Sequence, residues 1–135
     1  MSPEESETKA LIQYRMERSH ATLQDAQILY EQNGDPASIV NRAYYAMFYA
    51  ALAILVTVGQ EPSKHQGALA LFDQHFIKPK ILPKEMSKFL HHAFDTRQVG
   101  DYEDEVILNR EQALQVLESA VQFINSIEQK LSKQP

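Results

Sequence analysis

Apolar residues recur every three to four positions along most of the chain, which is the spacing of a helix with one buried face. The spacing predicts helices over about 7–32, 36–58, 64–76, 83–98 and 109–131. No segment alternates apolar and polar residues over a useful length, so no strand is expected. The pattern therefore predicts an all-α fold, an up-and-down antiparallel four-helix bundle in which the third helix is short and additional.

The second predicted helix is apolar on nearly all sides. Asp35-Pro36 marks its start, because an N-cap acceptor precedes a proline at the first helical position, and Gly59 marks its end. Its longest apolar run, 43–56, has 14 residues, whereas a membrane span needs about 20. We expect this helix in the centre of the fold. Since one small bundle would leave such a helix partly uncovered, we also expect a homodimer.

Local signals set the other boundaries. Ser63 is a plausible cap for the third helix, and Val99-Gly100 is expected to end the fourth, before an acidic loop at 101–105. Asn109 and Gln112 have the spacing of a capping box at the start of the last helix. That helix has an apolar seam with alternating steps of four and three, at Ala113, Leu117, Ala120, Ile124, Ile127 and Leu131.

The 135 residues are enough for one domain, 1–135, with its core at about 7–131. The chain has no cysteine, which excludes disulfides, thiolate catalysis and cysteine metal sites. Lys and Arg number 13 and Asp and Glu 18, so the net charge is −5 and any nucleic-acid contact must rest on a local patch or on a site built from two chains. The acidic N-terminus is unlike a signal peptide, and we expect a cytoplasmic protein.

Arg97 continues the apolar stripe of the fourth helix, four residues after Ala93 and three after Phe94. A guanidinium in such a position needs a partner, because an unpaired buried charge is costly. Asp101 and Tyr102 follow within reach. One interpretation is a structural Arg97–Asp101 pair at the helix end; the other is a catalytic group made of all three residues.

Two other groups are candidates for binding phosphate. Arg42, Tyr45 and Tyr49 share one face of the second helix, where a guanidinium and two phenols can hold a phosphate or stack on bases. They can equally be core aromatics with an arginine alongside. Lys64 and His65 stand at the start of the third helix, where anions bind, or they are ordinary surface residues.

A metal site is not favoured. A di-iron bundle needs two Glu-x-x-His motifs and further glutamates, and the sequence has one such string, 17–20. His91 and His92 are adjacent, so they point to different faces of a helix. We expect no metal and no cofactor.

The stretch Asn41-Arg42-Ala43-Tyr44-Tyr45-Ala46-Met47-Phe48 resembles the start of the second helix in HEPN-domain proteins, in a branch of small proteins related to HEPN toxins that pair with minimal nucleotidyltransferases. Lys64-His65 is similar to that branch's lysine-threonine-histidine turn. Arg97 followed by Asp101-Tyr102 is similar to its arginine and later Asp-Tyr pair. The resemblance extends over roughly residues 10 to 131.

The resemblance implies a helical bundle, a homodimer, and a toxin-antitoxin role beside a minimal nucleotidyltransferase, with metal-independent ribonuclease activity in many members. Active members have an arginine, a polar residue and, a few positions later, a histidine. Arg97-Gln98 matches the first half, but Asp101 and Tyr102 stand where the histidine is expected. Members modified by an adenylyl-transferring partner have a tyrosine two residues after that histidine. Asp104 occupies the equivalent position here, and Tyr102 is out of register.

The missing histidine bears on proton transfer. Metal-free RNA cleavage needs a base, an acid and a cation, and an aspartate near pKa 3.9 or a tyrosine near 10 transfers protons poorly at pH 7. We therefore expect His65 to take this role if the fold brings it close to Arg97. The alternative function is a catalytically silent helical module that docks on a nucleotidyltransferase. The candidate catalytic residues are Arg97, Asp101, Tyr102 and His65, and the candidate nucleotide- or phosphate-binding residues are Arg42, Tyr45 and Lys64.

Overall fold

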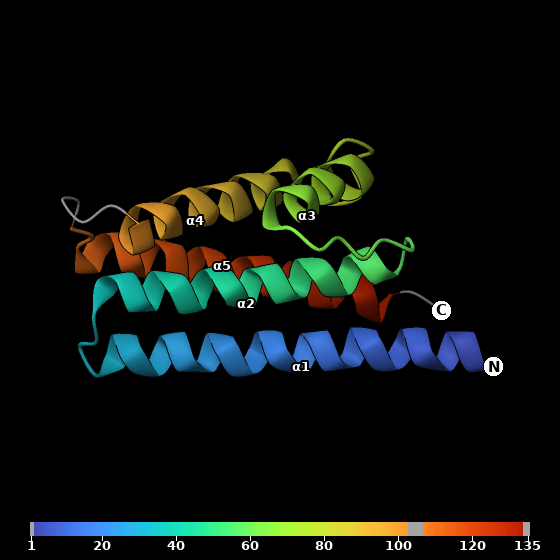
Figure 1. Cartoon of the computed structure of the whole chain (residues 1–135), viewed down its shortest axis with the longest axis horizontal. Coiled ribbons are helices and arrows are strands. Elements are labelled where there is room, and N and C mark those ends of the chain that lie inside the picture. Colours follow the sequence, from blue (N-terminus) through green and yellow to red (C-terminus); the bar gives the residue numbers. More distant parts are fainter. Residues whose placement is uncertain (1, 103–106, 134–135) are drawn as a thin grey trace.

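The computed structural model describes residues 2–102 and 107–133, and within them it contains helices and no strands, as predicted. The elements in chain order are α1 (Pro3–Glu31), α2 (Pro36–Val56), α3 (His65–Phe72), a π-helix η1 (Asp73–Ile77), α4 (Lys84–Tyr102) and α5 (Arg110–Ser132) (Figure 1).

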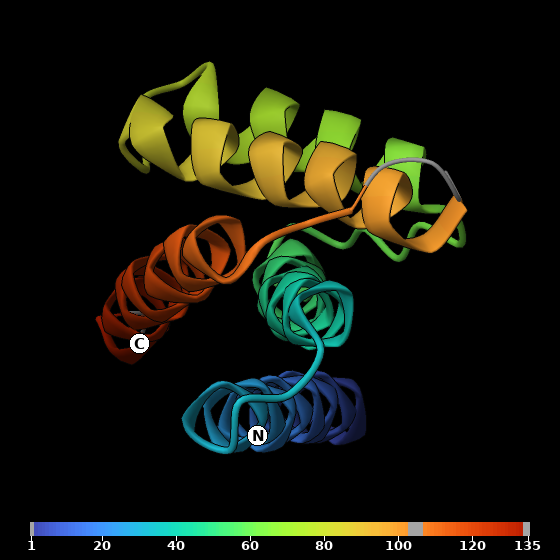
Figure 2. The same cartoon turned by 90° about the vertical axis from the view of Figure 1, so that its left-hand side faces the viewer.

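The four long helices alternate in direction, and α3 is inserted between the second and third of them (Figure 1). α1 lies along α2, and α5 packs on α2 and also contacts α1 (Figure 2). Figure 2 shows α3 and α4 side by side as a layer that crosses over α2 and α5. The predicted up-and-down bundle with one extra short helix is confirmed, with α4 inclined to its neighbours.

α2 is the central helix. The carboxylate of Asp35 accepts a hydrogen bond from the backbone N–H of Ser38 at 3.1 Å, and Pro36 occupies the first turn, as the sequence signal predicts. α1, α3, α4 and α5 all contact α2. By length and composition α2 is also the one described helix apolar enough to cross a membrane, but 72% of that apolar window is buried inside the bundle, as expected of a core helix.

α1 approaches α2 closely through small side chains. Ser19 is fully buried, and its hydroxyl donates a hydrogen bond of 2.6 Å to the carbonyl oxygen of Ala46. Ala43 and Ala50, on either side of Ala46, are also fully buried. This contact fixes α1 against α2, the central helix.

The predicted end of the fourth helix at Gln98 is wrong, because α4 continues through Gly100 to Tyr102. A Cβ on Gly100 would lie 2.7 Å from Cδ1 of Leu108 and 3.3 Å from Cβ of Ala37. The glycine therefore makes room for close packing of α4 against α2 and the segment before α5. Asp101 and Tyr102 are helical, and the rest of the predicted acidic loop lies outside the described residues.

The predicted cap of α3 is wrong, whereas the predicted capping box of α5 is confirmed. Ser63 is not the cap of α3, since Lys64 is the N-cap residue and no side chain caps the helix. The predicted single helix is α3 followed by the π-helical turn η1. At α5 the capping box is confirmed by hydrogen bonds of 2.8 and 2.9 Å between Asn109 and Gln112. The seam of α5 is buried up to Ile127 and partly exposed at Leu131.

A single chain covers more of α2 and α5 than the sequence suggested. α1, α3, α4 and α5 all pack on α2, and the seam of α5 faces the core. None of the large exposed apolar side chains among the described residues belongs to α2 or α5; they are Tyr14, Ile28, Val58, Ile81 and Ile107. Partial exposure remains at half-buried side chains of α2 such as Tyr45, Tyr49 and Leu52, so the packing of one chain does not decide whether a second chain covers them. The homodimer remains a prediction from the family resemblance.

Candidate active site

Arg97 is held in a cage of aromatic rings. Its position on the apolar stripe of α4 makes it almost fully buried, with 7% of its surface exposed. One guanidinium N–H donates a hydrogen bond of 3.0 Å to the hydroxyl of Tyr45. The guanidinium carbon lies 5.2 Å from the ring centre of Tyr44, 5.5 Å from that of Tyr45 and 5.7 Å from that of Phe94. These are cation–π distances, so the rings stabilise a cation in a desolvated place.

His65, the first residue of α3, is held by two contacts with α2. Its ring stacks on Phe48, with ring centres 4.2 Å apart and planes 13° from parallel. Its Nδ1 lies 2.7 Å from the hydroxyl oxygen of Tyr44. One contact fixes the plane of the imidazole and the other fixes its rotation within that plane.

Arg97 and His65 share the same neighbours. The imidazole centre of His65 lies 5.7, 5.5 and 6.3 Å from the ring centres of Tyr44, Tyr45 and Phe94. These are the same three rings that surround the guanidinium of Arg97. Residues 32 positions apart in sequence thus border one set of rings. We call this set the Arg97–His65 cluster, and its members are Arg97, His65, Tyr44, Tyr45, Phe48 and Phe94.

Burial and charge set the protonation states within the cluster. Burial lowers the pKa of His65, and the positive charge of Arg97 lowers it further, so the imidazole is neutral at pH 7. Burial also raises the pKa of Tyr44 well above its ordinary value, against the opposing effect of Arg97, so the phenol keeps its proton. The cluster thus combines one cation with a neutral imidazole and a neutral phenol.

Arg42 extends the cluster towards the start of α2. Its guanidinium carbon lies 5.3 Å from the ring centre of Tyr45, so that ring has a guanidinium from α2 and another from α4. Two Arg42 N–H groups donate to Oδ1 of Asn41 at 3.1 and 2.8 Å, and the Asn41 amide donates to Asp101 at 3.0 Å. Asp101 is therefore the hydrogen-bond partner of Asn41. The ion pairs among the described residues do not include one between Arg97 and Asp101.

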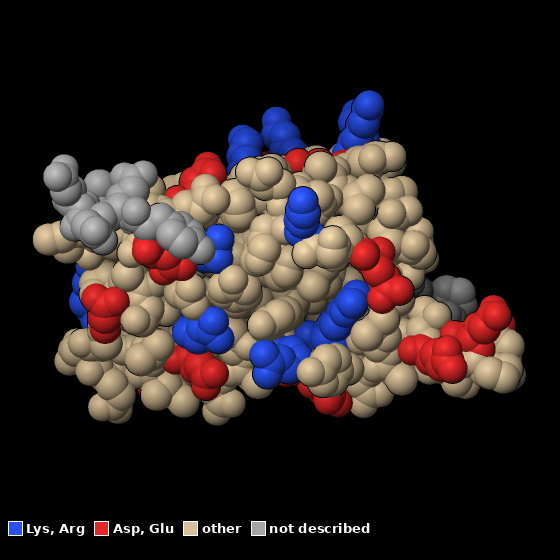
Figure 3. Space-filling model, in the orientation of Figure 1, with Lys and Arg blue, Asp and Glu red and all other residues tan. Residues whose placement is uncertain are grey.

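Two arginines of α1, which the sequence analysis did not identify, add further positive charge beside the tyrosines of α2. Arg18 lies over the ring of Tyr49 at 5.1 Å and donates to its hydroxyl at 3.4 Å. Arg15 donates to the carbonyl oxygen of Leu52 at 3.2 Å. Figure 3 shows basic side chains in a row along the boundary of α1 and α2, with acidic side chains beside both ends. The three-residue spacing of Arg15 and Arg18 places them on one helix face and could have indicated this surface.

The comparisons with known proteins fit this architecture. The model of the HEPN domain matches residues 12–130. The chain belongs to the HEPN family. A UPF0332 protein of Thermotoga maritima is 37% identical over 123 residues, which cover 91% of this chain and 92% of the relative. The protein named "Putative toxin MJ0605" of Methanocaldococcus jannaschii is 29% identical over 122 residues, 90% of each chain. "Putative toxin MJ0142" of the same organism is 36% identical over 86 residues, 64% of this chain and 58% of the relative.

The other residues singled out in this HEPN chain lie outside the cluster. Lys64 is exposed at the N-cap position of α3. Tyr102 belongs to the last turn of α4, and its side chain lies outside the described part. His20 pairs with Glu128 of α5, and His91 bonds to Asp73 of η1 at 2.7 Å. Among the described residues, no three His, Asp or Glu side chains gather in a way that could hold a metal ion.

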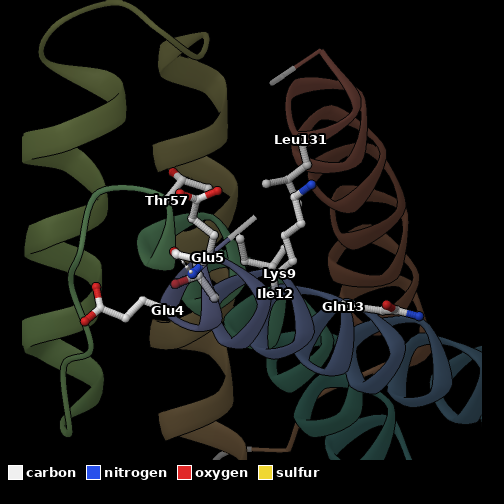
Figure 4. A pocket seen from close by; sticks show the side chains of 9 residues that line it. Glu4, Glu5, Lys9, Ile12, Gln13, Thr57 and Leu131 are labelled. Carbon is white, nitrogen blue, oxygen red and sulfur yellow. Dashed lines mark hydrogen bonds between the residues drawn. The ribbon is translucent and has the colours of Figure 1, made fainter.

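Two open hollows lie at opposite ends of α2 in the HEPN bundle. One, of about 640 Å³, is beside the cluster, where Asn41, Arg42, Gly100 and Asp101 are part of its wall. The other, of about 630 Å³, is lined by the start of α1 together with Thr57 and Leu131 (Figure 4). Only the first shares a residue with the phosphate-binding candidates, so the site is assigned to that end of the bundle.

Proposed function

We propose that this HEPN protein is a toxin-like RNA-binding protein that acts as the partner of a minimal nucleotidyltransferase. The observation that carries the RNA part is the Arg97–His65 cluster, in which a buried arginine and a neutral imidazole share three aromatic rings. The relatives named as toxins support the toxin-like role. The partner follows from the resemblance to HEPN toxins, and we expect the pair to act in the cytoplasm.

The surface beside the cluster suits a single-stranded phosphate backbone. Arg42 is half-buried and Arg18 is exposed, so both guanidinium groups reach solvent. Each lies over a tyrosine of α2, and the two tyrosine rings are 6.0 Å apart. Arginines neutralise phosphates, and half-buried aromatic rings offer faces on which bases stack. A local basic row of this kind permits RNA binding although the whole chain has a net charge of −5.

Binding is tested with a short single-stranded RNA and fluorescence anisotropy at several salt concentrations. Arg42→Ala should weaken binding about three- to tenfold and reduce the slope of log K against log salt by about 0.7. Lys9→Ala is the matched control, because it removes the same charge from an exposed site at the other end of α1. Equal affinities for both variants and for the wild type would refute RNA binding at this surface.

Metal-independent cleavage of RNA is a second candidate function, favoured by a histidine and a cation on the same rings. Arg97 would stabilise the negative charge of the phosphorane, and His65 would be the group that exchanges a proton with the substrate. Total RNA is incubated in EDTA with the wild type, Arg97→Ala and Lys9→Ala. Cleavage by the wild type and Lys9→Ala alone supports this function. Uncut RNA in all three reactions would refute it.

The partner is tested by co-expression with a minimal nucleotidyltransferase of the kind that pairs with HEPN toxins. We expect a stable complex on gel filtration and relief of any growth defect that the HEPN protein causes alone. A transferase complex formed by a chain that does not bind RNA would favour the alternative, a catalytically silent docking module. Separate elution of the two proteins would refute the pairing.

A further inference from the structure

Tyr44 is the fully buried tyrosine of the cluster, and its hydroxyl has one hydrogen-bond partner among the described residues. That partner is Nδ1 of His65, at 2.7 Å. A hydroxyl removed from water needs a partner for its proton, and a buried donor left unmatched is costly. The identity of the donor in this bond therefore decides which nitrogen of His65 has a proton.

Two arrangements are compatible with this contact. In the first the phenol donates to Nδ1, so the neutral imidazole has its proton on Nε2. In the second Nδ1–H donates to the phenol oxygen, and the phenol proton has no acceptor among the described residues. An oxygen with an unused lone pair is tolerated better than a buried O–H without an acceptor. The first arrangement is therefore preferred.

The protonation states of the cluster agree with this choice. The raised pKa of Tyr44 keeps the proton on the phenol, and the lowered pKa of His65 keeps the imidazole neutral. Stacking on Phe48 at 4.2 Å fixes the ring plane. The ring is thus held by its Nδ1 edge, and Nε2 makes no hydrogen bond to any described residue.

We propose that Tyr44 is a positioning residue that holds His65 as the Nε2–H tautomer, and that this N–H binds a backbone phosphate together with Arg97. The inference rests on the proposed RNA-binding function and assigns the ligand of that site as a phosphodiester. Arg97 and His65 border the same three rings, so both donors belong to one cluster, and a phosphate group accepts hydrogen bonds from more than one donor. In this state His65 donates to a phosphate oxygen and does not remove a proton from a hydroxyl, so this proposal counts against His65 as the proton carrier of the cleavage candidate.

The tautomer is measured in the free protein, without RNA. Long-range ¹H–¹⁵N correlation of the imidazole distinguishes a protonated ring nitrogen from an unprotonated one. We expect His65 to show a protonated Nε2 and an unprotonated Nδ1 at pH 7.5, and Tyr44→Phe to lose this strict preference. A wild-type spectrum with the proton on Nδ1 would overturn the proposal.

The ligand is tested by titration with inorganic phosphate, followed on the signals of His65 and Arg97 with His91 as internal reference. His65→Gln places an amide N–H near the position of Nε2, whereas His65→Asn places it near Nδ1. We expect Tyr44→Phe and His65→Asn to bind phosphate about three- to tenfold more weakly, and His65→Gln to stay close to the wild type. A purely structural histidine would not separate these two amides.

The outcomes separate this proposal from the proposed function. Phosphate binding that depends on Tyr44, in a chain that does not bind RNA, would refute the RNA function and support the phosphate site. RNA binding with unchanged affinity in Tyr44→Phe and His65→Asn would refute the role of Tyr44 and leave the RNA function standing. A wild type whose His65 and Arg97 signals do not respond to phosphate would overturn the phosphate site.

Discussion

The hydrogen bond between Tyr45 and Arg97 can be removed without changing the shape of the cluster. Tyr45→Phe deletes one hydroxyl and keeps the ring over which both guanidinium groups lie. A hydrogen bond to a charged group contributes about 1.5–3 kcal/mol to stability. Tyr45 is half-buried and Arg97 has further interactions, which lower the cost of the deletion. We therefore expect the free energy of unfolding to fall by about 1–2 kcal/mol.

Urea denaturation followed by circular dichroism measures this change. With a slope of about 2 kcal/mol per molar urea, the midpoint should fall by about 0.5–1 M while the slope stays constant. Tyr49→Phe is the matched control, because it removes the same hydroxyl from a bond of 3.4 Å to the exposed Arg18. That bond is screened by water, so the control should unfold at the wild-type midpoint.

The comparison of the two variants decides the result. If Tyr45→Phe and Tyr49→Phe have equal midpoints, the Arg97 bond contributes no more than a surface contact. The view of Arg97 as a desolvated cation held by α2 would then be wrong. A changed slope would instead mean that the variant alters the unfolded or folded ensemble, and hydrogen exchange at α4 would locate that change.

Three further predictions concern pH, capping and assembly. The pKa of His65 is lower in the folded protein than in the unfolded chain, where it is about 6.5. As the pH falls, the imidazole is therefore protonated more readily in the unfolded chain, and the free energy of unfolding should decrease from pH 7.5 to 5.5. Denaturation should show a smaller fall in His65→Gln, and equal falls would contradict the lowered pKa. Asn109→Ala should cost about 0.5–2 kcal/mol on thermal unfolding by loss of the capping box, and an unchanged midpoint would count against it. Light scattering at micromolar concentration should give about twice 15.4 kDa, whereas a single-chain mass would remove the homodimer.

Local chemistry explains which parts of the fold could be predicted. The start of α2 at Asp35-Pro36 and the capping box of Asn109 and Gln112 were predictable, because each depends on contacts within one helical turn. The central place of α2 followed from its composition alone. The end of α4 could not be predicted, because Gly100 is explained by packing against Leu108 and Ala37 and not by a turn.

The residues of the candidate site could be named from the sequence, but their partners could not. Arg97 was identified by its place on an apolar stripe, whereas its hydrogen-bond partner Tyr45 is 52 residues away. Asp101 seemed the natural partner by proximity in sequence, yet it binds Asn41, 60 residues away. Spacing along a helix fixes which face a side chain occupies, but it says nothing about which other helix covers that face.

The sequence by itself determined the helices, the helix that forms the core, and the candidate residues of the site, since these depend on composition and on neighbours within a few positions. Only the tertiary structure decided that α3 begins against α2, so that His65 stacks on Phe48 and meets the hydroxyl of Tyr44. That contact joins residues 21 positions apart through the crossing of α3 and α4 over α2. Desolvation at this crossing sets the protonation states of Tyr44 and His65. Because this burial arises from the packing of three helices, the sequence of any single helix does not reveal it.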